Sequence, residues 1–172
     1  MTRYAVLLRG INVGRNRRIA MADLRELLTG AGYSGVATLL QSGNVILDAT
    51  QPAAELGPAL EQLIEKRFGF PVGVILRSHE ELTRIVALNP FASVATDGSR
   101  YFVSFAGAEG SDEIPEVDSA DQYVVDGAET YLWCPDGMRD SPLIKALTKV
   151  KNPPPSTIRN WNTVEKLLTL MS

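Results

Sequence analysis

Residues 36–47 read VATLLQSGNVIL, two short apolar runs on either side of the polar turn formed by residues 41–44. Runs of this kind around a tight turn containing glycine are typical of a β-hairpin. On both sides of the hairpin, apolar residues recur at intervals of three and four, as they do on the buried face of a helix. These residues are Met21, Leu24, Leu27, Leu28 and Ala31 before it, and Leu56, Leu60, Leu63, Ile64 and Phe68 after it. The hairpin is therefore predicted to lie between two helices.

Two outer strands complete this half of the chain. Residues 4–8 and 72–76 are short apolar runs rich in strand formers. The succession strand, helix, strand, strand, helix, strand is the split βαβ pattern of ferredoxin-like folds. It predicts an antiparallel sheet with both helices on one face. The fold class is therefore α+β, and residues 1–90 are expected to form a ferredoxin-like βαββαβ half.

Residues 91–172 are expected to form a second, divergent α/β half, packed with the first as one compact unit. Strands are predicted over residues 100–105, 122–125 and 130–133, the last two joined by a hairpin turn at Asp126-Gly127. Ser141-Pro142 is typical of a helix start. After an extended spacer of three prolines at 153–155, a final helix is predicted, with Ile158 and Trp161 on its apolar face.

Composition limits the class of protein. The formal net charge of −3 argues against a general nucleic-acid coat protein, which would be basic throughout. The lone Cys134 leaves no internal disulfide and favours a reducing compartment. The apolar run at residues 4–8 is too short to span a bilayer, so we expect a cytoplasmic protein with no membrane partner. One stretch is strongly acidic and contains no lysine or arginine: Glu109, Asp112, Glu113, Glu116, Asp118, Asp121 and Asp126.

Several kinds of chemistry lack the residues they need. His79 and Cys134 are the only residues of their types, so no zinc site and no metal is expected. No glycine-rich nucleotide motif occurs, and no cofactor is predicted. His79 falls in the first turn of a helix and is expected at the surface. Cys134 ends a predicted strand and is expected to be a packed thiol.

The best candidate site is the loop over residues 9–18. It delivers the chain to the start of the first helix, where free amide groups and the helix dipole favour an anion. Two residues of the hairpin turn and one of the final helix are expected to lie near this loop. The alternative hypothesis is that the loop is flexible and its arginines only contact solvent. The predicted ligand-binding residues are Arg9, Asn12, Gly14, Arg15, Arg17, Ser42, Asn44 and Arg159.

Five segments also follow the pattern and order of a known family: residues 7–14 (LLRGINVG), Met21-x-x-Leu24-Arg25, residues 41–45 (QSGNV), residues 89–91 (NPF) and residues 159–164 (RNWNTV). With them, the chain resembles the bacterial domain-of-unknown-function family 1697 from end to end. The resemblance implies a two-part α+β fold and a bacterial cytosolic protein, and it implies no reaction. The chain departs from the family pattern around residues 136–141 and at the three prolines, where members commonly have a basic, serine-containing turn.

Three hypotheses about function stay open at this point. The leading one is a binding module for an anionic, phosphate-bearing ligand such as a nucleotide, a small metabolite or a nucleic-acid end. The second is a metal-independent enzyme of unknown reaction that would use Arg9, Ser42, Asn44 and Asp48 in a cleft between the halves. The third is a protein–protein adaptor that docks through the acidic stretch.

Overall fold

The computed structural model describes residues 1–107, 110 and 114–172 of the chain. It divides into two units, each of which is described by itself. The first unit contains Met1–Arg84 together with Leu167–Ser172, and the second contains Ile85–Lys166.

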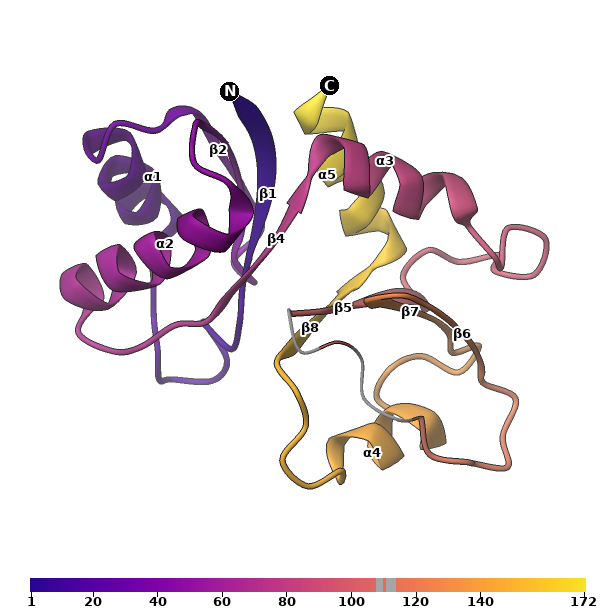
Figure 1. Ribbon diagram of the computed structural model, residues 1–172. Helices are drawn as coiled ribbons and strands as arrows, with labels where there is room; N and C mark the ends of the chain where they lie inside the picture. The colour runs from indigo at the N-terminus through magenta and orange to yellow at the C-terminus, as the bar shows by residue number, and fades with distance from the viewer. Residues whose placement is uncertain (108–109, 111–113) are drawn as a thin grey trace. The chain divides into compact units, whose positions relative to one another are not determined.

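The first unit is built on an antiparallel four-stranded sheet in the order β2-β3-β1-β4. Helices α1 and α2 lie on the same side of this sheet (Figure 1). With the sheet of the second unit, this arrangement confirms the α+β class; the ferredoxin-like description stays an interpretation of the strand order. In chain order the elements are β1 (Thr2–Leu8), α1 (Met21–Gly30), β2 (Ser34–Leu39), β3 (Asn44–Ala49), α2 (Ala53–Phe68) and β4 (Val74–Ser78).

The core of the first unit is formed by alternate side chains of β1 and by the apolar faces of α1 and α2. Successive side chains of a strand point to opposite faces, so every second residue of β1 joins the same cluster. Tyr4, Val6 and Leu8 pack in one cluster with Leu24 of α1 and Leu60 of α2, all of them buried. The apolar spacing in the sequence therefore identifies the helix faces that are buried.

Helix α3 (His79–Leu88) starts in the first unit and ends in the second. Its start is a capping box: the Glu81 amide donates to the Ser78 hydroxyl at 3.1 Å, and the Ser78 amide donates to the Glu81 carboxylate at 3.0 Å. Two backbone donors of the first turn are satisfied in this way. His79 is the first residue of the helix and is half-buried.

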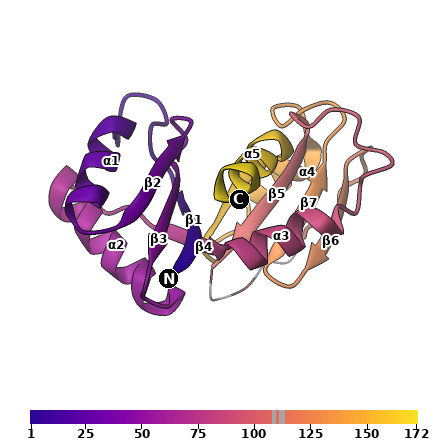
Figure 2. The same ribbon diagram turned by 90° about the horizontal axis from the view of Figure 1, so that it is seen from above.

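The second unit has its own antiparallel sheet, in the order β6-β7-β5-β8. Its elements are β5 (Tyr101–Ala106), β6 (Gln122–Asp126), β7 (Glu129–Trp133), α4 (Pro142–Thr148), β8 (Ser156–Asn160) and the start of α5 (Trp161–Met171). From Leu167 onwards, α5 belongs to the first unit. Figure 2 shows β5, β7 and β6 of this sheet from above. The predicted strands and the hairpin turn at Gly127, where φ is +59°, are confirmed.

One prediction for this half is wrong. Residues 156–160 were expected to belong to the final helix, but they form β8, which pairs with β5. Ile158 lies opposite Ser104, and Arg159 lies opposite Val103. The open edge of β5 offers a ladder of backbone hydrogen bonds, and this long-range pairing outweighs the local helical spacing.

Both faces of the second sheet carry packed side chains. On one face, Tyr101 stacks on Trp161 with ring centroids 4.5 Å apart, which confirms that Trp161 is a core residue. On the other face, Phe102 and Leu132 form a small cluster with Cys134 and with Leu143 of α4. The Ser141 hydroxyl caps α4 by accepting from the Ile144 amide at 3.0 Å, as the sequence predicts.

Candidate functional site

The loop between β1 and α1 is held in a defined conformation by Asn12. Its side-chain amide donates to the carbonyl oxygens of Ile19, at 2.9 Å, and of Gln41, at 2.7 Å. Its side-chain oxygen accepts from the Ile19 amide at 2.9 Å. The residue itself is left-handed, with φ of +55°, a conformation that asparagine tolerates better than most residues. Asn12 therefore joins both ends of its own loop to the β2–β3 turn.

Arg17 ties the same loop to the segment before β4. Its Nε donates to the Gly10 carbonyl at 2.9 Å, and an Nη donates to the Pro71 carbonyl at 2.6 Å. The guanidinium also lies over the Phe70 ring, 5.1 Å from its centroid, within the range of a cation–π contact. Arg17 is predicted from the sequence as a ligand-binding residue, and its anchoring role is not predicted.

The β2–β3 turn comes close to the loop because residue 43 is a glycine. A Cβ on Gly43 would lie 2.8 Å from Ile11 Cδ1 and 2.9 Å from Leu8 Cβ, and φ is +90°. Next to it, Asn44 is fully buried, and its side-chain amide donates to the Leu39 carbonyl at 2.8 Å and to the Ser42 hydroxyl at 3.0 Å. Asn44 therefore fixes the turn from inside, whereas Ser42 is exposed.

Arg9 follows the end of β1 and is half-buried. Its amide donates to the Gly73 carbonyl at 2.9 Å, and its Nη1 would lie 3.1 Å from a Cβ on Gly73. The end of β1, the start of β3 and the start of β4 thus meet at one edge of the first sheet. Hydrogen bonds join five of the predicted residues to this edge: Arg9, Asn12, Arg17, Ser42 and Asn44. Gly14 and Arg15 lie in the same loop, between Asn12 and Arg17.

Arg15 and Arg18 differ from their neighbours in this loop. Both side chains are exposed. Within the described part of the chain, neither makes a hydrogen bond or an ion pair, in contrast to Arg17. We call residues 9–20 the arginine loop. It combines an anchored backbone with two unengaged guanidinium groups.

Arg159, the eighth predicted residue, belongs to the second unit and lies on β8 rather than on a helix. It is buried, and its Nη1 donates to the Thr157 hydroxyl at 2.6 Å and to the Ile158 carbonyl at 2.9 Å. Burial lowers the pKa of this guanidinium to about 10, because removal from water disfavours the charged form.

The residues named for a metal-independent enzyme do not all come together. Asp48 lies near the other end of β3, opposite Arg3 of β1, whereas Asn44 lies opposite Leu7. The Asp48 carboxylate forms an ion pair with Arg3 at 3.0 Å. Four residues along a strand separate it from Asn44 by about 13 Å.

Cys134 is the packed thiol that the sequence predicts. It is fully buried, and burial raises the pKa of its thiol above the ordinary value. The neutral thiol is therefore the form present in the folded protein near neutral pH, and it is a poor nucleophile.

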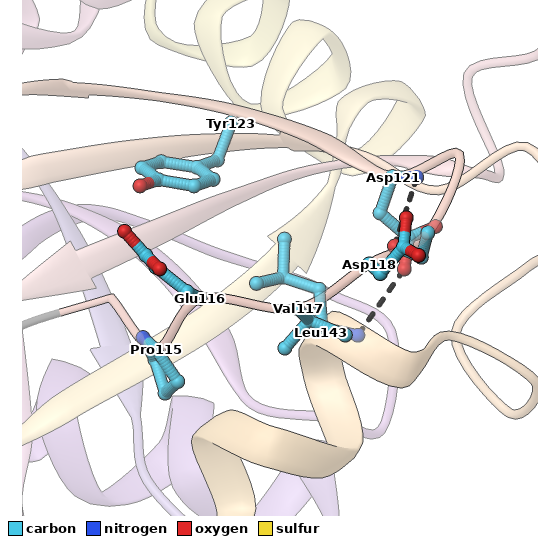
Figure 3. A pocket seen from close by; sticks show the side chains of 8 residues that line it. Pro115, Glu116, Val117, Asp118, Asp121, Tyr123 and Leu143 are labelled. Carbon is cyan, nitrogen blue, oxygen red and sulfur yellow. Dashed lines mark hydrogen bonds between the residues drawn. The ribbon is translucent and has the colours of Figure 1, made fainter.

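Residues 115–119 and Asp121, from the acidic stretch, line a hollow of about 540 Å³ in the second unit (Figure 3). Its carboxylates come from Glu116, Asp118 and Asp121. Asp121 is already engaged, because it accepts from the Ser141 hydroxyl at 2.7 Å and from the Leu143 amide at 3.2 Å. Glu109, Asp112 and Glu113 lie outside the described residues.

The described residues lack two features, a cluster of metal-binding side chains and a membrane-spanning helix. They contain no group of three or more His, Cys, Asp or Glu side chains that could hold a metal ion. Among the same residues, no helix has the length and apolar character needed to cross a bilayer.

Comparison with known proteins places the chain in a family. Residues 1–131 match the family model described as "Protein of unknown function (DUF1697)". In structure, the chain is similar to the conserved bacterial protein SP0830 from Streptococcus pneumoniae, with a TM-score of 0.79, 25% identity and coverage of 99% of both chains. No curated protein matches the sequence. The family match spans the arginine loop and the β2–β3 turn, and it confirms the resemblance seen in the sequence motifs. The chain therefore belongs to the DUF1697 family.

Proposed function

We propose that this protein binds an anionic, phosphate-bearing ligand at the arginine loop. The observation that carries the proposal is the contrast within the loop between anchored and unengaged side chains. Asn12 and Arg17 are committed to backbone carbonyls, whereas Arg15 and Arg18 are exposed and have no partner among the described residues.

An anchored loop makes those two charges more useful for binding. Ordering a flexible segment on binding costs conformational entropy, and a loop that is already ordered avoids much of that cost. The side chain of Asn12, three residues before Arg15, donates to the β2–β3 turn, and the side chain of Arg17, between Arg15 and Arg18, donates to the segment before β4. The loop therefore offers its guanidinium groups from a prepared position.

The chemistry of the two side chains favours phosphate. A guanidinium presents several donors in a planar fork and can contact two oxygens of one phosphate. The loop also leads into α1, whose N-cap residue Ala20 makes no side-chain cap hydrogen bond. The first amides of a helix favour negative charge, which adds to the attraction of the two arginines.

The test uses three probes: inorganic pyrophosphate, ATP and a single-stranded oligothymidylate. A ligand at one hundred times its Kd stabilises the folded protein by about 2.7 kcal/mol, which appears as a rise in Tm. We expect at least one probe to raise Tm and its affinity to fall as salt is added. If none of the three changes Tm, the proposal is wrong.

The position of the site is tested with R15Q/R18Q. The matched control is R84Q/R139Q, which removes the same charge from two other exposed arginines. We expect R15Q/R18Q to weaken binding of the active probe at least tenfold and the control to change it less than twofold. For the oligonucleotide, the slope of log K against log salt should become less steep by about 1.4, since each phosphate contact contributes roughly 0.7. Equal losses in the two variants would show that overall charge, and not this loop, is responsible.

A further inference from the structure

Among the described residues, α4 covers only part of one face of the second sheet. Helix α4 has 7 residues, which is about 10 Å at 1.5 Å per residue. Strand β5 has 6 residues, which is about 20 Å at 3.3 Å per residue. A helix of this length cannot cover the strands from end to end.

The cluster of buried residues on this face lies at one end. Its members are Phe102, Leu132, Cys134 and Leu143. Towards the other end of β5 the side chains on the same face are smaller than Phe102, since they belong to Ser104 and Ala106. Thr130 of β7 lies directly opposite Ser104, and Ile158 of β8 lies on its other side.

A cavity of about 400 Å³ occupies the uncovered part of the face. Its walls come from the sheet, from the second half of α4 and from the segment before β8. The apolar part of the lining includes Ala106, Leu132, Ile144, Leu147, Pro153 and Ile158. The volume falls within the range of about 300–1,000 Å³ that small-molecule sites occupy.

The polar side chains of the lining all carry hydroxyl groups, and one of them, Thr157, accepts from the Arg159 guanidinium at 2.6 Å. Ser104 and Thr130 lie side by side at the floor, and Thr148 and Ser156 are exposed side chains at the rim. No acidic or basic side chain lines the cavity within the described part of the chain. A charged ligand would lose its hydration with no opposite charge to compensate, whereas a neutral apolar ligand would not.

We propose that this cavity is a binding site for a neutral, mainly apolar small molecule that carries one hydrogen-bonding group. The apolar walls take the hydrocarbon part, and the hydroxyl pair of Ser104 and Thr130 orients the polar group. Most ligand sites combine a largely apolar wall with a few placed polar groups in this way. The proposal concerns the second unit alone and does not depend on the arginine loop.

The test uses 2-naphthol as the probe, because it has two fused rings, one hydroxyl and no charge at neutral pH. Isothermal titration of the full chain should give saturable binding at one site. Naphthalene-2-sulfonate has the same rings and a permanent charge, and it should bind at least tenfold more weakly. Absence of naphthol binding would overturn the proposal, and equal binding of the sulfonate would overturn the neutral ligand class.

Two variants locate the site. S156W places a large side chain at the rim and should abolish naphthol binding, whereas S93W adds the same side chain to another exposed serine of the second unit and should leave binding within twofold. T130V removes a floor hydroxyl while keeping the shape, and it should weaken naphthol about tenfold. Far-UV circular dichroism checks that each variant is folded. Naphthol binding by folded S156W at the affinity of S93W would place the ligand elsewhere and refute the assignment.

Discussion

The replacement of Asn12 by alanine tests the central feature of the candidate site, the anchoring of its loop. The change removes three hydrogen bonds, of 2.7 to 2.9 Å, that join the loop to Ile19 and Gln41. Each contributes about 1 kcal/mol net to folding. Alanine is also less tolerant of the left-handed backbone at φ +55° than asparagine. Because the side chain is only half-buried, we expect a total loss of about 3 kcal/mol in the free energy of unfolding.

The assay is urea unfolding followed by far-UV circular dichroism, with tryptophan fluorescence as a second signal. Both tryptophans, Trp133 and Trp161, lie in the second unit, so fluorescence reports on that unit and dichroism reports on both. The loop belongs to the first unit. We therefore expect N12A to shift the dichroism transition more than the fluorescence transition.

Two companion variants make the result interpretable. Asn16 is an exposed residue of the same loop, and N16A should change the free energy of unfolding by less than about 0.5 kcal/mol. N12G removes the same hydrogen bonds but accepts positive φ, so it should be more stable than N12A by roughly 1 kcal/mol. If N12A and N16A have the same stability, the loop is not anchored by Asn12 and the reasoning behind the site fails.

Three further predictions concern other parts of the molecule. G35A should lower the free energy of unfolding by more than about 1 kcal/mol in urea titrations. A Cβ on residue 35, where φ is +60°, would lie 2.5 Å from Asp48 Oδ2 and 2.8 Å from Arg3 Nη1. The control is G14A, where φ is +66° but no atom lies near the added Cβ, and it should lower the free energy of unfolding less. S141A should cost about 1 to 2 kcal/mol by the same measurement, since it removes the cap of α4 and the bond to Asp121, and a loss below 0.5 kcal/mol would contradict this. Burial raises the pKa of the Tyr101 phenol to about 12, so the unfolded chain loses this proton at lower pH than the folded protein does, and the free energy of unfolding should fall as pH rises from 10 towards 12. Y101F should make this fall less steep. If the dependence of the free energy of unfolding on pH is the same in Y101F, the phenol is not buried as described.

Most of the fold follows from local sequence patterns. The helical spacing from Leu56 to Phe68, the glycine that ends α2 with φ +86°, and the turn at Gly127 each specify a structure within a few residues of themselves. Strand β8 could not be found in this way. Its only large apolar residue, Ile158, also fits the spacing of the helix that follows, and the pairing with β5 joins residues fifty or more positions apart.

For the candidate site too, local features can be predicted from the sequence and long-range contacts cannot. The sequence indicates that residues 9–18 are rich in arginine and precede a helix, and the structure agrees. It does not indicate which arginines are engaged, because one of the two carbonyl partners of Arg17 is that of Pro71, 54 positions away. Nor does it separate Asn12, which holds the backbone, from Asn16, whose side chain is exposed. Side-chain roles in this loop depend on contacts that form only after the sheet has assembled.

The first unit contains residues from both ends of the chain, and these are synthesised at different times on the ribosome. Leu167–Ser172 belong to this unit, and Arg3 of β1 donates to the Leu170 carbonyl at 3.2 Å. Translation proceeds from the amino end, so the whole second unit is made before these residues emerge. The bond between Arg3 and the Leu170 carbonyl can therefore form only after the second unit has been synthesised.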